Sequence, residues 1–450
     1  MKDKEPKKAK LPLKKANDFD EWVVENSNKK STLEDEAEDK KDEDRKTETK
    51  KATDNKVETT HKNSKTKKSS LAFLIFGILF LIGGAGALAA SFLIHKESGF
   101  VAVFPEIPSS KTADTGIYSR LTGLALASEA EVTAPAYCVQ TPNGMDGARP
   151  QAGLNEAGVV FEAIAEAGIT RFAAIYQNPA SAVIGPIRSL RLYYLQWDTP
   201  FDCTIVHAGG APDALQAVSR GYKDLTENYS YMYRGTRGER RWNNLFTTSS
   251  YLSKMNSDRG YGGSDIKGFT RMTPAESLVS RVDALAEEKL VIYQPSSGKT
   301  SSLNPKAINI AINFGGIASF NVRYNYNADN NNYLRSYATG YSHDIYACPA
   351  GDLGEKNPES ECQLTQLAPS VIVAMIVPEK KASDNYHEDI TTVGSGEAYV
   401  FQNGIAIKGT WKKDSVADQI RFYDESGIEI ALAPGQTFVE AVPGYGSVEY

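Results

Sequence analysis

Chemically reactive side chains are scarce in this sequence. Its 450 residues include only 4 cysteines, 5 histidines, 6 methionines and 4 tryptophans. No two cysteines have the CxxC spacing of a zinc or redox site, and neither a phosphate-binding loop nor the GxSxG turn of serine hydrolases is present. These absences leave no signature of a named chemistry, and we expect no metal and no cofactor.

The first 70 residues lack aliphatic runs. They hold 20 Lys/Arg and 17 Asp/Glu, as in EDEAEDKKDEDRKTETKK, and such a segment buries too little apolar surface to offset the entropy lost on ordering. We therefore predict a disordered cytoplasmic tail over 1–70. Its charges are mixed in sign and nearly balanced, which argues against a nucleic-acid partner.

The longest stretch without a charge runs from residue 71 to 94, LAFLIFGILFLIGGAGALAASFLI. Its length suits one transmembrane helix. Four lysines at 62–68 precede it, so the positive-inside rule places the N-terminus in the cytoplasm and everything after Lys96 outside. The alternative is a signal peptide cleaved near Ala87-Leu88-Ala89, but the long charged leader and the length of the apolar stretch favour a membrane anchor.

All four cysteines lie beyond this predicted span, where an oxidising compartment would allow two disulfides. Cys348 and Cys362 flank a polar loop, CPAGDLGEKNPESEC, and we predict that they pair. Cys138 and Cys203 would then pair by elimination. Cys203 also lies in an apolar run, so a buried free thiol is a second interpretation.

The outer part divides into three regions. Residues 95–125 carry prolines and small polar residues typical of a stalk. Residues 126–290 alternate apolar runs with helical patterns, which predicts a mixed α/β domain. From 291 to 450 the pattern has period two with turn signals such as Asn403-Gly404, which predicts an antiparallel β-rich domain. The predicted fold class is α+β.

The run VVFEAIAEAGITRFAAIY at 159–176 is apolar except for Glu162, Glu166 and Arg171. We interpret it as a hairpin turning at Ala167-Gly168, in which Ile164 would oppose Arg171 and the two glutamates would flank this arginine diagonally. In one interpretation Arg171 neutralises both carboxylates in a buried network. In the other, at least one glutamate faces a ligand or acts as an acid or base.

Two arginines follow in IGPIRSLRLYYLQW. Pro186 fits the first turn of a helix, whose spacing would put Arg188 and Arg191 on one stripe. Paired guanidinium groups can grip a carboxylate or phosphate. The alternative is that they pair with acidic side chains, for which the candidates are Glu162, Asp202 and Asp213.

A third polar candidate is His207, at the end of the apolar run DCTIVHA. It precedes Gly209-Gly210 and a helix predicted to begin near Pro212, and strand ends beside helix N-termini favour anions. His207 is equally suited to bond a backbone carbonyl.

Several segments taken together, EAGITRFAAIYQ, IGPIRSLRLYYL, IVHAGGAPDA, RRWNNLFTT and GEAYVFQNGIAIKGTWKK, resemble the YerB-like lipoprotein family of unknown function. The resemblance covers roughly 125–445 and implies an extracytoplasmic envelope protein with two domains. Members of this family typically carry a lipid-modified cysteine after a signal peptide. The first cysteine of this chain is Cys138, so a transmembrane helix would replace the lipid anchor. The family also tends to have Pro-His-Asn where this chain has Trp242-Asn243-Asn244, and an asparagine cannot shuttle protons as that histidine could.

Two functions compete for the outer domains, and a third hypothesis is a tether whose cytosolic tail carries the function. The favoured hypothesis is a single-pass, membrane-anchored envelope protein that binds a wall or glycan ligand, or an envelope protein partner, through a polar cleft in the α/β domain. The alternative is a wall-glycan hydrolase with Glu162 or Glu166 as general acid, assisted by Asp202 or His207. We expect one cleft at the strand ends to hold the ligand-binding residues, which are Glu162, Arg171, Arg188, Arg191, His207 and Asn244.

Overall fold

The computed structural model describes residues 115–450 apart from 236–242, 287–289, 295–298, 305 and 352–357. The predicted tail, the predicted membrane span at 71–94 and most of the predicted stalk lie outside the described residues. Within the described ranges no helix is both long and apolar enough to cross a membrane. The span at 71–94 therefore stays a prediction from sequence.

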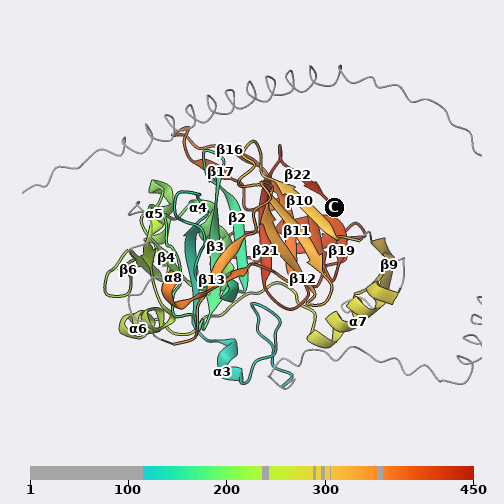
Figure 1. The fold of residues 1–450 in the computed structure, drawn as a ribbon, viewed down its shortest axis with the longest axis horizontal. Helices are drawn as coiled ribbons and strands as arrows, with labels where there is room; N and C mark the ends of the chain where they lie inside the picture. The colour runs from blue at the N-terminus through green and yellow to red at the C-terminus, as the bar shows by residue number, and fades with distance from the viewer. Residues whose placement is uncertain (1–114, 236–242, 287–289, 295–298, 305, 352–357) are drawn as a thin grey trace, which may run out of the picture. The chain divides into compact units, whose positions relative to one another are not determined.

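One ten-stranded sheet forms the centre of the fold (Figure 1). Its strands, in spatial order, are β20 (Arg421–Asp424), β19 (Ile405–Lys413), β18 (Gly394–Gln402), β15 (Val371–Val377), β21 (Thr437–Pro443), β2 (Val159–Glu166), β3 (Ile169–Gln177), β1 (Ala136–Pro142), β4 (Thr204–His207) and β5 (Asp224–Thr226).

This sheet passes through both predicted domains. β21 pairs in parallel with β2 on one side and with β15 on the other, so that Glu440 lies opposite Glu162. The β-rich half is consequently mixed rather than purely antiparallel, which corrects that part of the prediction. Because backbone hydrogen bonds join β2 to β21, the two halves of the chain share one continuous sheet.

Smaller sheets surround the main one. A four-stranded sheet has the order β12 (Asn332–Tyr337), β11 (Val322–Asn327), β10 (Asn309–Asn313) and β22 (Ser447–Glu449). The remaining strands form two-stranded pairs: β13 (Asp344–Ala347) with β14 (Gln363–Gln366), β16 (Glu379–Lys381) with β17 (Glu388–Ile390), β6 (Tyr233–Arg234) with β7 (Leu245–Phe246), and β8 (Leu290–Gln294) with β9 (Lys299–Asn304).

The helices are short. They are α3 (Glu129–Val132), α4 (Leu192–Asp198), α5 (Pro212–Val218), α6 (Ser249–Arg259), α7 (Pro274–Ala286), α8 (Pro358–Glu361) and two 3₁₀ turns, η1 (Leu154–Glu156) and η2 (Thr199–Phe201). α4 begins six residues later than predicted. The N–H groups of Ile187, Arg188 and Leu190 donate to the carbonyls of Leu245, Gln140 and Gly209, so this segment is extended between its neighbours rather than helical.

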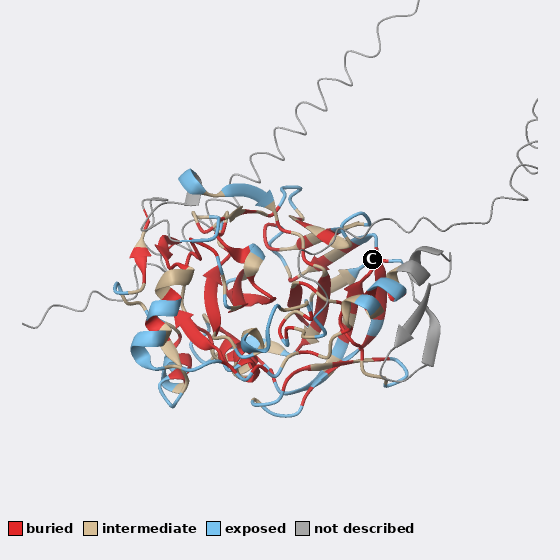
Figure 2. Cartoon of the chain, turned by 90° about the horizontal axis from the view of Figure 1, so that it is seen from below, coloured by how far each residue is buried: buried red, intermediate tan, exposed pale blue. Residues whose placement is uncertain are grey.

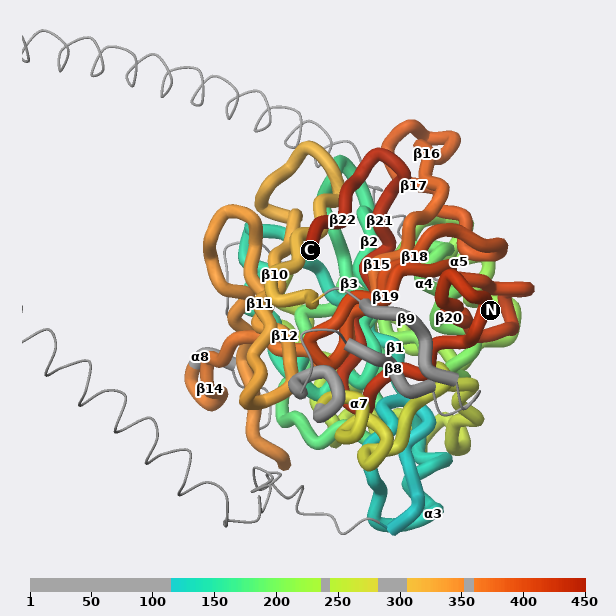
Figure 3. The backbone as a smooth tube through the Cα atoms, turned by 90° about the vertical axis from the view of Figure 1, so that its right-hand side faces the viewer, coloured from blue at the N-terminus to red at the C-terminus, as the bar shows by residue number. Residues whose placement is uncertain are grey.

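The main sheet packs on both faces (Figure 2). The first face carries Val159, Phe161 and Ala163, which belong to one core cluster with Tyr194 and Trp197 of α4. The second face carries Val160 and Phe172 beside α6, and it continues under β10, β11 and β12 (Figure 3). A side chain on either face is therefore covered, which makes any charge placed there costly unless it is paired.

The β2–β3 hairpin forms as predicted, with Ala167 and Gly168 at φ 49° and 75° in its turn. Its register differs from the prediction because a bulge interrupts the pairing between Ile164 and Glu166. Arg171 faces Ala163 instead of Ile164. The extra residue, Ala165, shifts the alternation by one, so Glu162 points to the second face and Glu166 to the first.

Both disulfides are present. Cys348 and Cys362 pair as predicted, with Cα atoms 4.3 Å apart. Cys138 pairs with Cys203, with Cα atoms 5.7 Å apart, which rules out the free-thiol interpretation. The Cys138–Cys203 bridge joins β1 to the residue that precedes the neighbouring strand β4. It therefore holds the edge of the sheet that carries β4 and β5.

The two bridges should differ in their effect on stability. Cross-linking constrains the unfolded chain more when the closed loop is longer, and the separations are 65 residues for Cys138–Cys203 and 14 for Cys348–Cys362. Loop-closure entropy then gives about 4 kcal/mol for the first and about 3 kcal/mol for the second. Urea unfolding of the Cys138→Ala/Cys203→Ala and Cys348→Ala/Cys362→Ala variants checks this order. A larger loss of unfolding free energy in Cys348→Ala/Cys362→Ala than in Cys138→Ala/Cys203→Ala would contradict it.

Candidate functional site

Arginine side chains gather around one glutamate on the first face of the sheet. Arg171 Nη2 lies 2.7 Å from Glu166 Oε1, and Arg191 Nη2 lies 2.6 Å from Glu166 Oε2. All three side chains are buried. Burial alone would raise the pKa of Glu166, but the two guanidinium groups outweigh it and lower that pKa to about 2. Glu166 is therefore a fixed carboxylate at neutral pH.

Arg188 is a third arginine near Glu166. Burial and the charge of Arg171 lower the pKa of Arg188 to about 10, against the opposing influence of Glu166 and Asp146. No described residue forms a hydrogen bond with the Arg188 guanidinium or lies within ion-pair distance of it. We define the arginine cluster as Arg171, Arg188, Arg191 and Glu166. It holds three guanidinium groups against one carboxylate.

Local backbone structure explains why these residues meet. The bulge at Ala165 turns Glu166 onto the face of Arg171, and the extended segment before α4 carries Arg188 and Arg191 past the same strand ends. Arg171 Nη1 also donates to the Ser189 carbonyl at 2.8 Å, which ties the hairpin to this segment. The predicted helical stripe of Arg188 and Arg191 is wrong, yet both arginines still reach the cluster.

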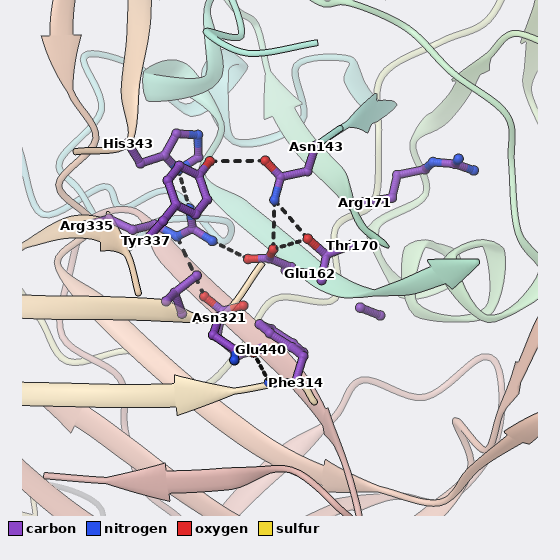
Figure 4. Close-up of polar contacts among 12 residues, drawn as sticks. Asn143, Glu162, Thr170, Arg171, Phe314, Asn321, Arg335, Tyr337, His343 and Glu440 are labelled. Atoms are coloured by element: carbon purple, nitrogen blue, oxygen red, sulfur yellow. Dashed lines mark hydrogen bonds and ion pairs between the residues drawn. The ribbon is translucent and has the colours of Figure 1, made fainter. Parts of the chain in front are cut away.

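Glu162 belongs to a different network on the second face (Figure 4). Its Oε1 accepts from Asn143 Nδ2 at 3.0 Å and from Thr170 Oγ1 at 2.5 Å, while Oε2 pairs with Arg335 Nη2. The side chains of Glu162 and Arg335 are both 0 % exposed. Arg171 lies apart from this network (Figure 4), so the single predicted cleft with Glu162 beside Arg171 does not form.

Arg335 and His343 fix one another. Arg335 Nη1 donates to His343 Nδ1, and His343 Nε2 then donates to Gln151 Oε1 at 3.0 Å. Burial, reinforced by the charges of Arg335 and Arg149, lowers the pKa of His343 well below its usual value. His343 is therefore neutral, and both of its ring nitrogens are already in use.

Glu440 completes the buried network. Tyr324 Oη donates to Glu440 Oε1, and Arg335 Nε lies 4.0 Å from the same oxygen. Burial and the neighbouring charge of Glu162 raise the pKa of Glu440 well above its usual value. Two adjacent buried carboxyl groups share one arginine most favourably when one is protonated, so Glu440 carries the proton. We define the seam network as Glu162, Glu440, Arg335, His343 and Tyr324.

Neither candidate glutamate is placed to act as a general acid. Glu162 is fully buried and its oxygens accept from Asn143, Thr170 and Arg335. Glu166 is held ionised by two arginines. A general acid needs a proton to give and a substrate within hydrogen-bond reach. The geometry thus gives no support to the hydrolase hypothesis.

The remaining predicted site residues lie elsewhere. The His207 side chain is 1 % exposed, with Nδ1 2.7 Å from the Gly209 carbonyl and Nε2 2.9 Å from Asp224 Oδ1, so it serves the β4–β5 edge. Asp202 pairs with Lys223 at 2.9 Å on the surface. Asn244 accepts from Arg234 at 3.1 Å and donates to the Gly235 carbonyl. Only Glu166 and the three arginines come together.

Sequence patterns missed Arg335, His343 and Glu440. One signal was available, because β12 alternates strictly and places Arg335 on the buried side between Tyr333 and Tyr337. An arginine flanked by two inward-facing tyrosines indicates a buried charge that needs a partner. Among the residues that the structure describes, no three His, Cys, Asp or Glu side chains gather closely enough to hold a metal ion.

Comparison with known proteins places these residues in a family. The N-terminal and C-terminal domains of the protein family of unknown function DUF3048 match residues 121–262 and 310–439. The "Putative lipoprotein YerB" of Bacillus subtilis (strain 168) is 25% identical over 326 residues, which cover 72% of this chain and 85% of that protein. The crystal structure of YerB from Bacillus subtilis has 22% identity and a TM-score of 0.57, covering 74% of this chain and 100% of that one.

The arginine cluster makes stability depend on pH. Glu166→Gln leaves Arg171 and Arg191 without their counter-charge, which should lower the free energy of unfolding at pH 7 by about 3–5 kcal/mol. The exposed Glu129→Gln control should change it by less than about 0.5 kcal/mol.

The sign of the pH effect follows from the lowered pKa of Glu166. Its contribution is present above the unfolded-state value near 4.5 and is lost as the pH falls through about 2. The stability difference between the parent protein and Glu166→Gln should therefore shrink from pH 5 to pH 2 in urea titrations. A difference that stays constant over that range would contradict this assignment.

The seam network yields a second test, in which two glutamates behave differently. Glu440→Gln replaces one neutral group by another and should cost less than about 1 kcal/mol. Glu162→Gln removes the counter-charge of Arg335 and should cost about 3–5 kcal/mol. Urea unfolding of both variants at pH 7 measures the contrast. Equal losses would mean that Glu440 is also ionised.

Proposed function

Because the chain belongs to the YerB-like family, whose two domains have no established function, we propose from the geometry that it is an extracytoplasmic, membrane-anchored binding protein. Its ligand is an anionic group of the cell envelope, held by the arginine cluster. The observation that carries this proposal is the excess of positive charge, since Glu166 pairs with both Arg171 and Arg191 and Arg188 has no partner among the described residues.

The form of the cluster suits an anion. Glu166 holds Arg171 and Arg191 in place, and both are further fixed through the carbonyls of Ser189 and Leu190. Fixed guanidinium groups bind carboxylate or phosphate with little loss of side-chain entropy. Partial burial strengthens the attraction relative to bulk water. An anion beside Arg188 would supply the second negative charge that the cluster lacks.

Three independent features support a location outside the cytoplasm. Two disulfides are typical of proteins outside the reducing cytoplasm. The charge pattern around 71–94 predicts one membrane span with the folded part outside. The relative from Bacillus subtilis is named a lipoprotein, and in this chain the predicted helix would take over the anchoring. Acidic wall polymers and glycans are the anionic groups that such a protein meets.

A phosphate titration tests the proposal. Inorganic phosphate is titrated into the detergent-solubilised full chain at low ionic strength, with calorimetric detection. Losing one charge-assisted contact of about 1.5–3 kcal/mol should weaken binding by roughly 10-fold or more in Arg188→Met. Arg220→Met is the matched control, because Arg220 is exposed in the same domain and forms no ion pair with any described residue. This variant should bind phosphate as the parent does.

Two outcomes would contradict the proposal. One is phosphate affinity that is the same in Arg188→Met and the parent protein. The other is release of reducing ends from purified wall glycan by the parent chain. That second result would favour the hydrolase instead.

A further inference from the structure

A cavity lies where the two family domains meet. It has a volume of about 300 Å³, and its walls include Met145 and Arg149 from the N-terminal domain and Tyr337, Tyr341 and Asp344 from the C-terminal domain. Clefts between domains are frequent sites for small ligands, and this volume is at the lower end of the range for such sites. We propose that this pocket binds a single sugar ring that carries a carboxylate.

Arg149 supplies the charged contact. Its Nε donates to Asn143 Oδ1 at 2.8 Å, its Nη2 donates to the Ser319 carbonyl at 3.0 Å, and its Cζ lies 3.7 Å from the centroid of the Tyr337 ring. The remaining nitrogen, Nη1, donates to no described residue. Among the described residues of the pocket wall, Arg149 is the one Arg or Lys. A fixed guanidinium with one unused nitrogen matches a single carboxylate.

The rest of the wall suits the hydroxyl groups of a sugar. Asp344 accepts from the Ser342 hydroxyl at 2.7 Å through Oδ1, which leaves its other oxygen for a ligand hydroxyl. Thr339 and Ser342 add further hydroxyl groups. Tyr341, 77% exposed, also lines the pocket, and its ring offers a flat apolar surface for the C–H face of a pyranose.

Hydrogen bonds connected to the seam network fix two side chains of the pocket wall, Tyr337 and His343. Tyr337 Oη donates to Asn143 Oδ1 at 3.1 Å, the same oxygen that fixes Arg149. His343 is fixed at both ring nitrogens by Arg335 and Gln151. A binding site is most selective when its side chains are fixed in advance by a second layer of hydrogen bonds. Because both nitrogens of His343 are in use, this histidine is not available to exchange a proton with a ligand in the pocket.

This site is independent of the arginine cluster, since none of the four cluster residues lines the pocket. The two proposals can fail separately. Arg188→Met should therefore leave sugar binding unchanged while it weakens phosphate binding.

Glucuronic acid and glucose form the matched pair of probes, because they differ only in the carboxylate at C6. In saturation-transfer NMR and calorimetry with the full chain, glucuronate should bind at least about 10-fold more tightly than glucose, as one charge-assisted contact implies. Arg149→Gln should abolish that preference. Tyr341→Ala should weaken glucuronate binding several-fold, whereas Tyr445→Ala, which removes an exposed tyrosine outside the pocket, should not.

Tyr341→Ala guards against misfolding, because the Tyr341 side chain is exposed and, within the described part of the chain, only its backbone carbonyl accepts a hydrogen bond, from the Tyr337 amide. Equal affinity for glucuronate and glucose would overturn the proposal. So would acetate that competes as well as glucuronate, because the sugar ring would then contribute nothing. Glucuronate binding that survives both Arg149→Gln and Tyr341→Ala would place the ligand elsewhere.

Discussion

The ion pair between Glu162 and Arg335 is the interaction on which the architecture depends. It joins the central strand β2 to β12 in the covering sheet, and both side chains are completely shielded from water. An isolated charge in such a place would cost several kcal/mol, so neither residue is tolerable without the other. Since β2 comes from the N-terminal domain and β12 from the C-terminal one, each family domain needs the other to neutralise its buried charge.

The Glu162–Arg335 pair and the shared sheet both hold the N-terminal domain against the C-terminal domain. β2 hydrogen-bonds to β21, and Glu440 on β21 lies opposite Glu162. From Arg335 the hydrogen bonds continue through His343 and Gln151 to Asn143, which fixes Arg149 and Tyr337. Buried charged groups thus fix the orientation of Arg149 and Tyr337 in the wall of the inter-domain pocket. A hydrophobic replacement could fill the same volume but could not orient those hydrogen-bonding side chains.

Local patterns in the sequence predicted much of the fold and little of the site. The β2–β3 and β18–β19 hairpins were evident because Ala167-Gly168 and Asn403-Gly404 punctuate strand-like runs. The bulge at Ala165 has no sequence signature, and one extra residue reversed the direction of Glu166 relative to Glu162. The extended path of 187–190 depends on carbonyls from distant segments. Arg335 and Glu162 are 173 positions apart, a pairing that one sequence cannot reveal.

The bulge also accounts for the division of labour between the two faces. In an unbroken strand Glu162 and Glu166 would share one side and flank Arg171, as the predicted register had it. With Ala165 inserted, Glu162 pairs with Arg335 between the two domains and is not available to a substrate. Glu166 points to the other face, where it pairs with Arg171 and Arg191 at the strand ends. One carboxylate pairs with two guanidinium groups there, and among the described residues Arg188 has no ion-pair partner. Both carboxylates hold arginine side chains in place, so neither is free to transfer a proton to a substrate.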